Sequence, residues 1–81
     1  MSIWFQNYTI KDIKTKGTMV EHLGIKVIEL GEDYVVGTMP VDNRTKQPFG
    51  ILHGGASVAL AETLASYGGY LTIDPEKYYV V

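Results

Sequence analysis

The chain has 81 residues and a formal net charge of −2, with 46% hydrophobic and 20% charged residues. A chain of this length forms one small domain at most, and such domains bury only about two-thirds of the surface that the unfolded chain exposes. Seven Lys and Arg residues are scattered and outnumbered by nine acids, which argues against nucleic-acid binding. The absence of cysteine excludes disulfides and thiolate metal sites, and it is typical of a reducing compartment. We therefore expect a cytoplasmic protein.

Two short helical turns are expected near residues 9–15 and 18–23. Thr18 and Glu21 have the spacing of a capping box, in which each side chain can accept a hydrogen bond from the backbone N–H of the other residue. Gly24 fits the position after the last helical residue, where a positive φ is cheap only for glycine.

An antiparallel hairpin is expected next. Residues 25–30 and 34–39 are apolar, β-branched runs, and Gly31-Glu32-Asp33 joins them. Pro40 should end the second strand, because proline cannot donate to a strand ladder.

A polar loop over residues 41–49 should lead into one long helix over residues 54–73, about 27 Å in length at 1.5 Å per residue. Apolar residues cover nearly its whole circumference, as in helices that lie buried. Residues 51–73 are long enough to suggest a membrane span, but an acid, a histidine, glycines and hydroxyl groups within them argue against one.

The last residues, 77–81, are aromatic and β-branched, which predicts a strand that stops without a turn or a polar tail. A long buried helix with antiparallel strands before and after it favours an α+β architecture, in which a curved sheet wraps round the helix. Only about three strands are expected here. We therefore expect residues 1–81 to be a single domain that is incomplete at its C-terminus.

Glu62 is the one acid between Gln47 and Ile73, a stretch that contains no Lys, Arg or Asp. Desolvating an unpaired carboxylate is costly, so an acid midway along an apolar helix is a candidate catalyst. Of its neighbours one helical turn away, only Ser66 can hydrogen-bond to it, and none is a cation. The alternative, that Glu62 lies in solvent on a less buried helix, stays open.

His53, Gly54 and Gly55 mark the start of the helix. A helix N-terminus presents free backbone N–H groups and a partial positive charge, which suit a developing oxyanion. The two glycines would let a ligand approach those groups without obstruction. The alternative is a tight turn in which His53 simply hydrogen-bonds to the backbone.

The spacing of these two features sets a constraint. Glu62 lies eight residues past Gly54, which is about 12 Å along the helix axis. One substrate carbonyl cannot contact both the helix N-terminus and Glu62 of the same helix. If both act on one substrate, two chains must supply them, with their helices antiparallel across a two-fold axis.

Residues 41–62, VDNRTKQPFGILHGGASVALAE, resemble the central motif of the hotdog-fold acyl-CoA thioesterases. They most resemble the branch that includes 1,4-dihydroxy-2-naphthoyl-CoA hydrolase and the aryl-CoA thioesterases. The loop, the His-Gly-Gly run and the helical acid all fall at the family's spacing, and the resemblance covers nearly the whole chain. The departure is length, because domains of that family continue past the last expected strand.

The resemblance implies a role for each site residue. Glu62 would be the catalytic carboxylate, acting as a nucleophile or as a general base on water. The N–H of Gly54 or Gly55 would polarise the thioester carbonyl, while Gln47 and His53 would position thioester and water. The residues that the resemblance implies for substrate binding are Ser66 and Phe49.

The resemblance therefore predicts hydrolysis of an acyl-CoA, with an aromatic or related acyl group, to the free acid and CoA without metal or cofactor. It also implies a homo-oligomer, a dimer at least and a tetramer by family pattern, with no nucleic-acid or membrane partner. Two alternatives remain: a hotdog dehydratase and a non-catalytic acyl-CoA-binding or regulatory domain. The loop sequence differs from that of the dehydratases, and a mere binder has no use for Glu62 together with Gln47.

Overall fold

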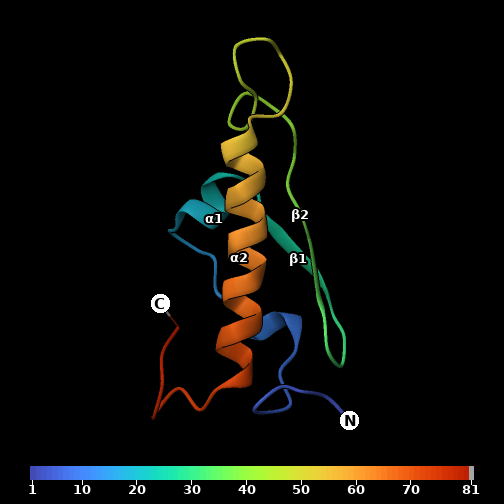
Figure 1. Cartoon of the computed structure of the whole chain (residues 1–81), viewed down its shortest axis with the longest axis vertical. Coiled ribbons are helices and arrows are strands. Elements are labelled where there is room, and N and C mark those ends of the chain that lie inside the picture. Colours follow the sequence, from blue (N-terminus) through green and yellow to red (C-terminus); the bar gives the residue numbers. More distant parts are fainter. Residues whose placement is uncertain (81) are drawn as a thin grey trace.

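The computed structural model describes residues 1–80, with one long helix as the axis of the molecule (Figure 1). The β-hairpin runs along one side of this helix, and both chain ends lie toward its C-terminal end (Figure 1). The elements in chain order are η1 (Ile10–Asp12), α1 (Met19–His22), β1 (Lys26–Leu30), β2 (Val35–Thr38) and α2 (Gly54–Thr72).

The long helix α2 confirms the prediction from the sequence and ends one residue earlier than expected. At its start, His53 has extended backbone angles, and its carbonyl accepts hydrogen bonds from the N–H groups of Ala56 and Ser57 at 3.0 and 3.2 Å. At its end, Asp74 precedes Pro75, and a residue before proline avoids the helical region. Local chemistry therefore fixes both ends of α2.

The hairpin is also confirmed. β1 pairs antiparallel with β2, with Lys26 opposite Thr38 and Leu30 opposite Val35. The register shifts between Val27 and Glu29, which is a bulge that the apolar pattern of the sequence did not reveal.

The two helical turns form at η1 and α1, and Gly24 has the expected positive φ of 75°. The capping box at Thr18 is wrong. The hydroxyl of Thr18 donates to the carbonyl of Thr15 at 2.6 Å, and the carboxylate of Glu21 accepts from the N–H of Gly17 at 3.1 Å. The turn from Thr15 already satisfies the Thr18 N–H, so Glu21 is not needed there.

The burial expected for α2 is wrong for the part of the chain that the structure describes. Of the helix residues, only Thr63 and Leu71 are buried, because two strands can cover one side of a helix but not all of it. The accessible surface is 5916 Å², against about 4,900 Å² for a compact monomer of this mass. The radius of gyration is 13.9 Å, against about 12 Å for a compact domain.

The strand expected at residues 77–81 is not formed over residues 77–80, and residue 81 lies outside the described residues. The N–H groups of Lys77 and Tyr78 both donate to the carbonyl of Asp74 at 3.0 Å, which makes a turn. A strand needs a neighbouring strand to pair with, and none lies beside this segment among residues 1–80. Within the same residues, no helix combines the length and the apolar character needed to cross a membrane.

Candidate active site

The loop that leads into α2 is anchored at Thr45, which is 1% exposed. Its hydroxyl donates to the carbonyl of Pro40 at 2.7 Å and accepts from the N–H of Asp42 at 3.0 Å. Its carbonyl accepts from the N–H of His53 at 2.7 Å. The two ends of the loop are therefore held together at one buried residue, whose role the sequence analysis missed. The Asp-x-x-Thr spacing, typical of side-chain-capped turns, could have indicated it.

Asp42 and Arg44 stiffen the same loop. Arg44 Nη2 lies 2.6 Å from Asp42 Oδ2, and the backbone N–H of Arg44 also donates to Asp42. These hydrogen bonds from Arg44 lower the pKa of Asp42 to about 2. Arg44 Nη1 donates to the carbonyl of His22 at 2.9 Å, so the loop is also tied to the end of α1.

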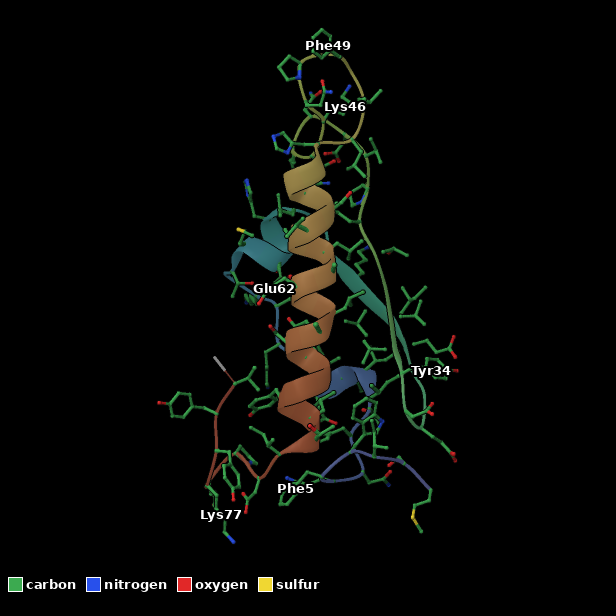
Figure 2. The ribbon with its side chains drawn as sticks, viewed as in Figure 1. Phe5, Tyr34, Lys46, Phe49, Glu62 and Lys77 are labelled. Atoms are coloured by element: carbon green, nitrogen blue, oxygen red, sulfur yellow. The ribbon has the colours of Figure 1, made fainter. Side chains whose placement is uncertain are left out.

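Gln47 shapes the tip of the loop. Its side-chain oxygen accepts from the N–H of Phe49, and its carbonyl accepts from the N–H of Gly50 at 2.9 Å. Gly50 has a φ of 86°, which favours glycine at that turn. Phe49 stands at the tip, 89% exposed (Figure 2). The side-chain NH₂ group of Gln47 has no partner among residues 1–80 and remains a free donor.

His53 caps α2 with its own side chain. Nδ1 accepts from the N–H of Gly55 at 2.8 Å. In a neutral imidazole with Nδ1 as acceptor, the proton must be on Nε2. The Gly55 N–H is therefore occupied, while the Gly54 N–H has no partner in the part of the chain that is described. The helix N-terminus thus presents two donors, the Gly54 N–H and the His53 Nε2–H.

Glu62 lies midway along α2 with its side chain exposed (Figure 2). The alternative that the sequence left open, a solvent-facing Glu62, therefore holds for the described residues. The Ser66 hydroxyl donates to Glu62 Oε1 at 2.7 Å, which is the hydrogen bond expected from the spacing. No ion pair to Glu62 forms within residues 1–80, so this hydroxyl is its one described polar partner.

Glu62 and Ser66 line an open groove of about 720 Å³. One wall is α2, and the opposite wall is the N-terminal segment, which contributes Ile13 and Lys14. The remaining lining residues are Tyr8, Asp12, Tyr67, Tyr70, Leu71, Tyr79 and Val80. The sequence analysis missed this wall because no local pattern pairs residues that lie about fifty positions apart.

The structure thus forms two clusters rather than one site. The first, the loop cluster, comprises Gln47 and Phe49 in the loop and His53, Gly54 and Gly55 at the start of α2. The second, the Glu62 cluster, comprises Glu62 and Ser66, and Glu62 lies further along α2 (Figure 2). Because α2 is continuous from Gly54 to Thr72, the axial separation of about 12 Å between Gly54 and Glu62 stands. The chain does not bring its helix N-terminus to its own Glu62.

Comparison with known proteins identifies thioesterases as relatives. The chain is 60% identical over 72 residues to the proofreading thioesterase EntH of Cronobacter sakazakii, and 47% identical over 77 residues to a putative esterase of Haemophilus influenzae. These matches cover 86% and 93% of this chain, but 53% and 56% of the relatives. The chain therefore spans about half the length of the curated relatives it matches. No protein-family model matches it.

Two solved structures extend the comparison to the fold. A mutant of thioesterase PA1618 from Pseudomonas aeruginosa superposes with a TM-score of 0.93 at 41% identity, over 99% of this chain and 59% of that one. Thioesterase HI1161 from Haemophilus influenzae superposes with a TM-score of 0.83 at 47% identity, over 89% of this chain and 52% of that one. The resemblance to hotdog-type thioesterases is confirmed, and the described residues have the fold of about half of such a protein.

Proposed function

We propose that the protein that contains this chain hydrolyses an acyl-CoA thioester to the free acid and CoA, with Glu62 as its catalytic carboxylate. One observation carries the proposal: a carboxylate held by the Ser66 hydroxyl lines a groove in a chain that is 60% identical to a thioesterase. Thioester hydrolysis needs an attacking oxygen and a polarised carbonyl, and the two clusters have the groups for these two tasks.

The Glu62 cluster supplies the attacking oxygen. The hydrogen bond from Ser66 holds Oε1, while Oε2 has no partner among the described residues. In one route Oε2 attacks the thioester carbon, the C–S bond breaks with release of CoA, and water then hydrolyses the resulting anhydride to the free acid and Glu62. In the other route Oε2 takes a proton from a water molecule whose oxygen attacks the thioester carbon, and the C–S bond then breaks, with that proton passing to the CoA thiolate. Both routes use the ionised carboxylate, which the Ser66 hydroxyl orients.

The loop cluster supplies the polarised carbonyl. Gly54 is the first residue of α2, and its free N–H lies at the positive end of the helix dipole. A carbonyl oxygen that gains negative charge in the transition state is stabilised there. We assign the His53 Nε2–H and the Gln47 NH₂ group as further donors to the thioester or the attacking water. His53 thus has two roles, as helix cap and as donor.

A complete site requires a dimer in this proposal, because the two clusters are too far apart along one helix. Exposed apolar side chains near the start of α2 support association: Phe49, Ile51 and Val58 are 89%, 62% and 66% exposed. Two copies with antiparallel α2 helices would place the loop cluster of each chain beside Glu62 of the other. The tetramer expected from the family pattern would join two such dimers.

For the acyl group we propose an aromatic or related structure. Four tyrosines line the groove beside Glu62, and aromatic rings favour offset-stacked or edge-to-face contact with another ring. These residues are Tyr8, Tyr67, Tyr70 and Tyr79. We also propose a cytoplasmic location, which the absence of cysteine supports.

The test is release of CoA from a panel of aromatic and aliphatic acyl-CoAs, followed by free-thiol detection in the complete natural protein. Glu62→Gln keeps the shape and removes the charge, so we expect kcat to fall by about 10²- to 10⁴-fold. Glu21→Gln is the matched control, because Glu21 is an exposed glutamate with one hydrogen bond outside the groove. It should keep wild-type turnover.

Three results would contradict the proposal. Turnover near that of the wild type in the Glu62→Gln protein would remove Glu62 from the chemistry. Tight binding of acyl-CoA without release of thiol would instead support the non-catalytic domain, and formation of an enoyl product would support the dehydratase.

A further inference from the structure

The N-terminal segment, residues 3–18, is fastened to α2 at two points. The N–H of Phe5 donates to the carbonyl of Leu71 at 2.7 Å, near the end of the helix. The Tyr67 hydroxyl donates to the carbonyl of Lys14 at 2.9 Å, one helical turn or so nearer to Glu62. Within residues 1–80 these are the two hydrogen bonds that join the segment to α2.

The groove lies between the segment and the helix. Tyr8, Asp12, Ile13 and Lys14 form its wall on the segment side, facing the helix wall that includes Glu62. η1 is only one turn long and packs mainly beside β1 rather than α2. Among the described residues, the Tyr67 hydroxyl therefore makes the hydrogen bond between segment and helix that lies nearer to Glu62.

We propose that Tyr67 is a positioning residue, whose hydroxyl sets the width of the groove beside Glu62 by holding Lys14 against α2. Tyr67 lies about one and a half helical turns past Glu62, and Tyr67, Lys14 and Glu62 all line the same groove. Binding of a large acyl group should depend on the width of the groove, whereas binding of an acetyl group should depend on it less. The effect on substrates rests on the proposed thioesterase function. The hydrogen bond from Tyr67 to the Lys14 carbonyl, called the tether below, does not.

The surroundings of Tyr67 suit this role. Its side chain is half-buried, and burial raises its pKa. A raised pKa keeps the hydroxyl protonated at neutral pH, so it stays a donor to the Lys14 carbonyl. The hydroxyl of Tyr70, one turn away in the same groove, makes no hydrogen bond among the described residues, so among these two tyrosines only Tyr67 joins α2 to the segment.

The first test measures the tether without any assay of activity. Lys14 and Lys16 are exposed trypsin sites in the segment, and native-state cleavage reports how often the segment opens. Tyr67→Phe removes one oxygen and keeps the ring. Loss of one hydrogen bond should raise the cleavage rate at these lysines by about 2- to 10-fold. Unchanged cleavage would overturn the tether, whether or not the protein is a thioesterase.

The second test measures the consequence for substrates. In the Tyr67→Phe protein, KM for a large acyl-CoA should rise by about 2- to 10-fold, and by more than KM for acetyl-CoA. Tyr34→Phe is the matched control, since the Tyr34 hydroxyl also makes one hydrogen bond, to Glu29 on the hairpin, away from the groove. Faster cleavage with an unchanged KM would overturn the positioning role.

Discussion

The start of α2 and the groove around Glu62, the two regions that we propose act in the reaction, are held together in different ways. At the start of α2 the groups are local: His53 caps the helix with Nδ1 and leaves the next N–H, that of Gly54, without a partner. In the groove, by contrast, the wall that faces Glu62 comes from the N-terminal segment, and the Tyr67 hydroxyl reaches back 53 residues to hold it. The first cluster is formed by consecutive residues, and the second depends on tertiary structure.

This difference divides the proposed reaction between two regions. The helix start has hydrogen-bond donors and no carboxylate, so it can polarise a carbonyl but cannot activate water as a base. The groove has the carboxylate and no free backbone donor of the helix. About 12 Å of one continuous helix separates Gly54 from Glu62, and for this reason we propose that each site is shared between two chains.

The larger of the two effects that distinguish these regions concerns the helix start as a backbone donor. Gly54→Pro removes one N–H, and proline is favoured at the first position of a helix. His53 already has the extended angles that a residue before proline requires, with φ −71° and ψ 130°. The helix should therefore persist, while kcat for thioester hydrolysis should fall by about 10²- to 10³-fold, as for loss of one oxyanion donor.

Gly54→Ala is the control for this substitution, because it keeps the N–H and adds a methyl group. Apart from its chain neighbours and the nearby helix backbone, no described heavy atom lies within 4 Å of the position that its Cβ would occupy. We expect a loss of less than about tenfold, well below that of the proline variant. Equal losses in the two variants, with helix content shown to be intact by circular dichroism, would mean that bulk matters there and the donor does not.

A smaller effect concerns the loop that holds Gln47. Arg44 lowers the pKa of Asp42 from its ordinary value of 3.8 to about 2. Because the pKa of Asp42 is lower in the folded protein than in the unfolded chain, ionised Asp42 stabilises the folded state. This stabilisation is fully present above pH 3.8 and is lost as the pH falls toward 2. Asp42→Asn keeps the side-chain oxygen of the turn and removes the charge, so its thermal stability should fall less between pH 4 and pH 2 than that of the wild type.

Thermal melts at several pH values would measure this difference, which should be small because both side chains are 40% exposed. Asp33→Asn is a suitable control, since Asp33 makes no hydrogen bond in the part of the chain that the structure describes. If the Asp42 and Asp33 variants show the same pH dependence, the Asp42–Arg44 pair does not stabilise the loop.

The sequence predicted the local features of this chain well. The helix, the hairpin and the Glu62–Ser66 hydrogen bond follow from periodicity, turn residues and the four-residue spacing on a helix. It predicted burial of α2 and a final strand wrongly, because both depend on what packs against them. Two strands leave much of α2 open, and residues 77–80 have no described strand to pair with.

In the loop of the candidate site, too, the sequence did not predict contacts that depend on the folded structure. His53 was found from its residue type and its place at the helix start, and Gln47 from the resemblance. The alternative that His53 hydrogen-bonds to the backbone holds, because its side chain accepts from the Gly55 N–H. The partner of Gln47, the Phe49 N–H, was not predicted. The hydrogen bond to His53 decides which glycine remains a donor, and composition carries no information about it. The resemblance left Gly54 and Gly55 as equal candidates, and the side-chain cap separates them.

The division of the site between two chains is the central claim, and subunit mixing tests it most directly. A Glu62→Gln chain and a chain with both Gln47→Ala and His53→Ala should each be inactive alone. After equal mixing and exchange, about a quarter of wild-type activity should return, because half of the dimers are mixed and one of their two sites is intact. No recovery, with exchange confirmed by mass spectrometry, would place both clusters in one chain and contradict the account.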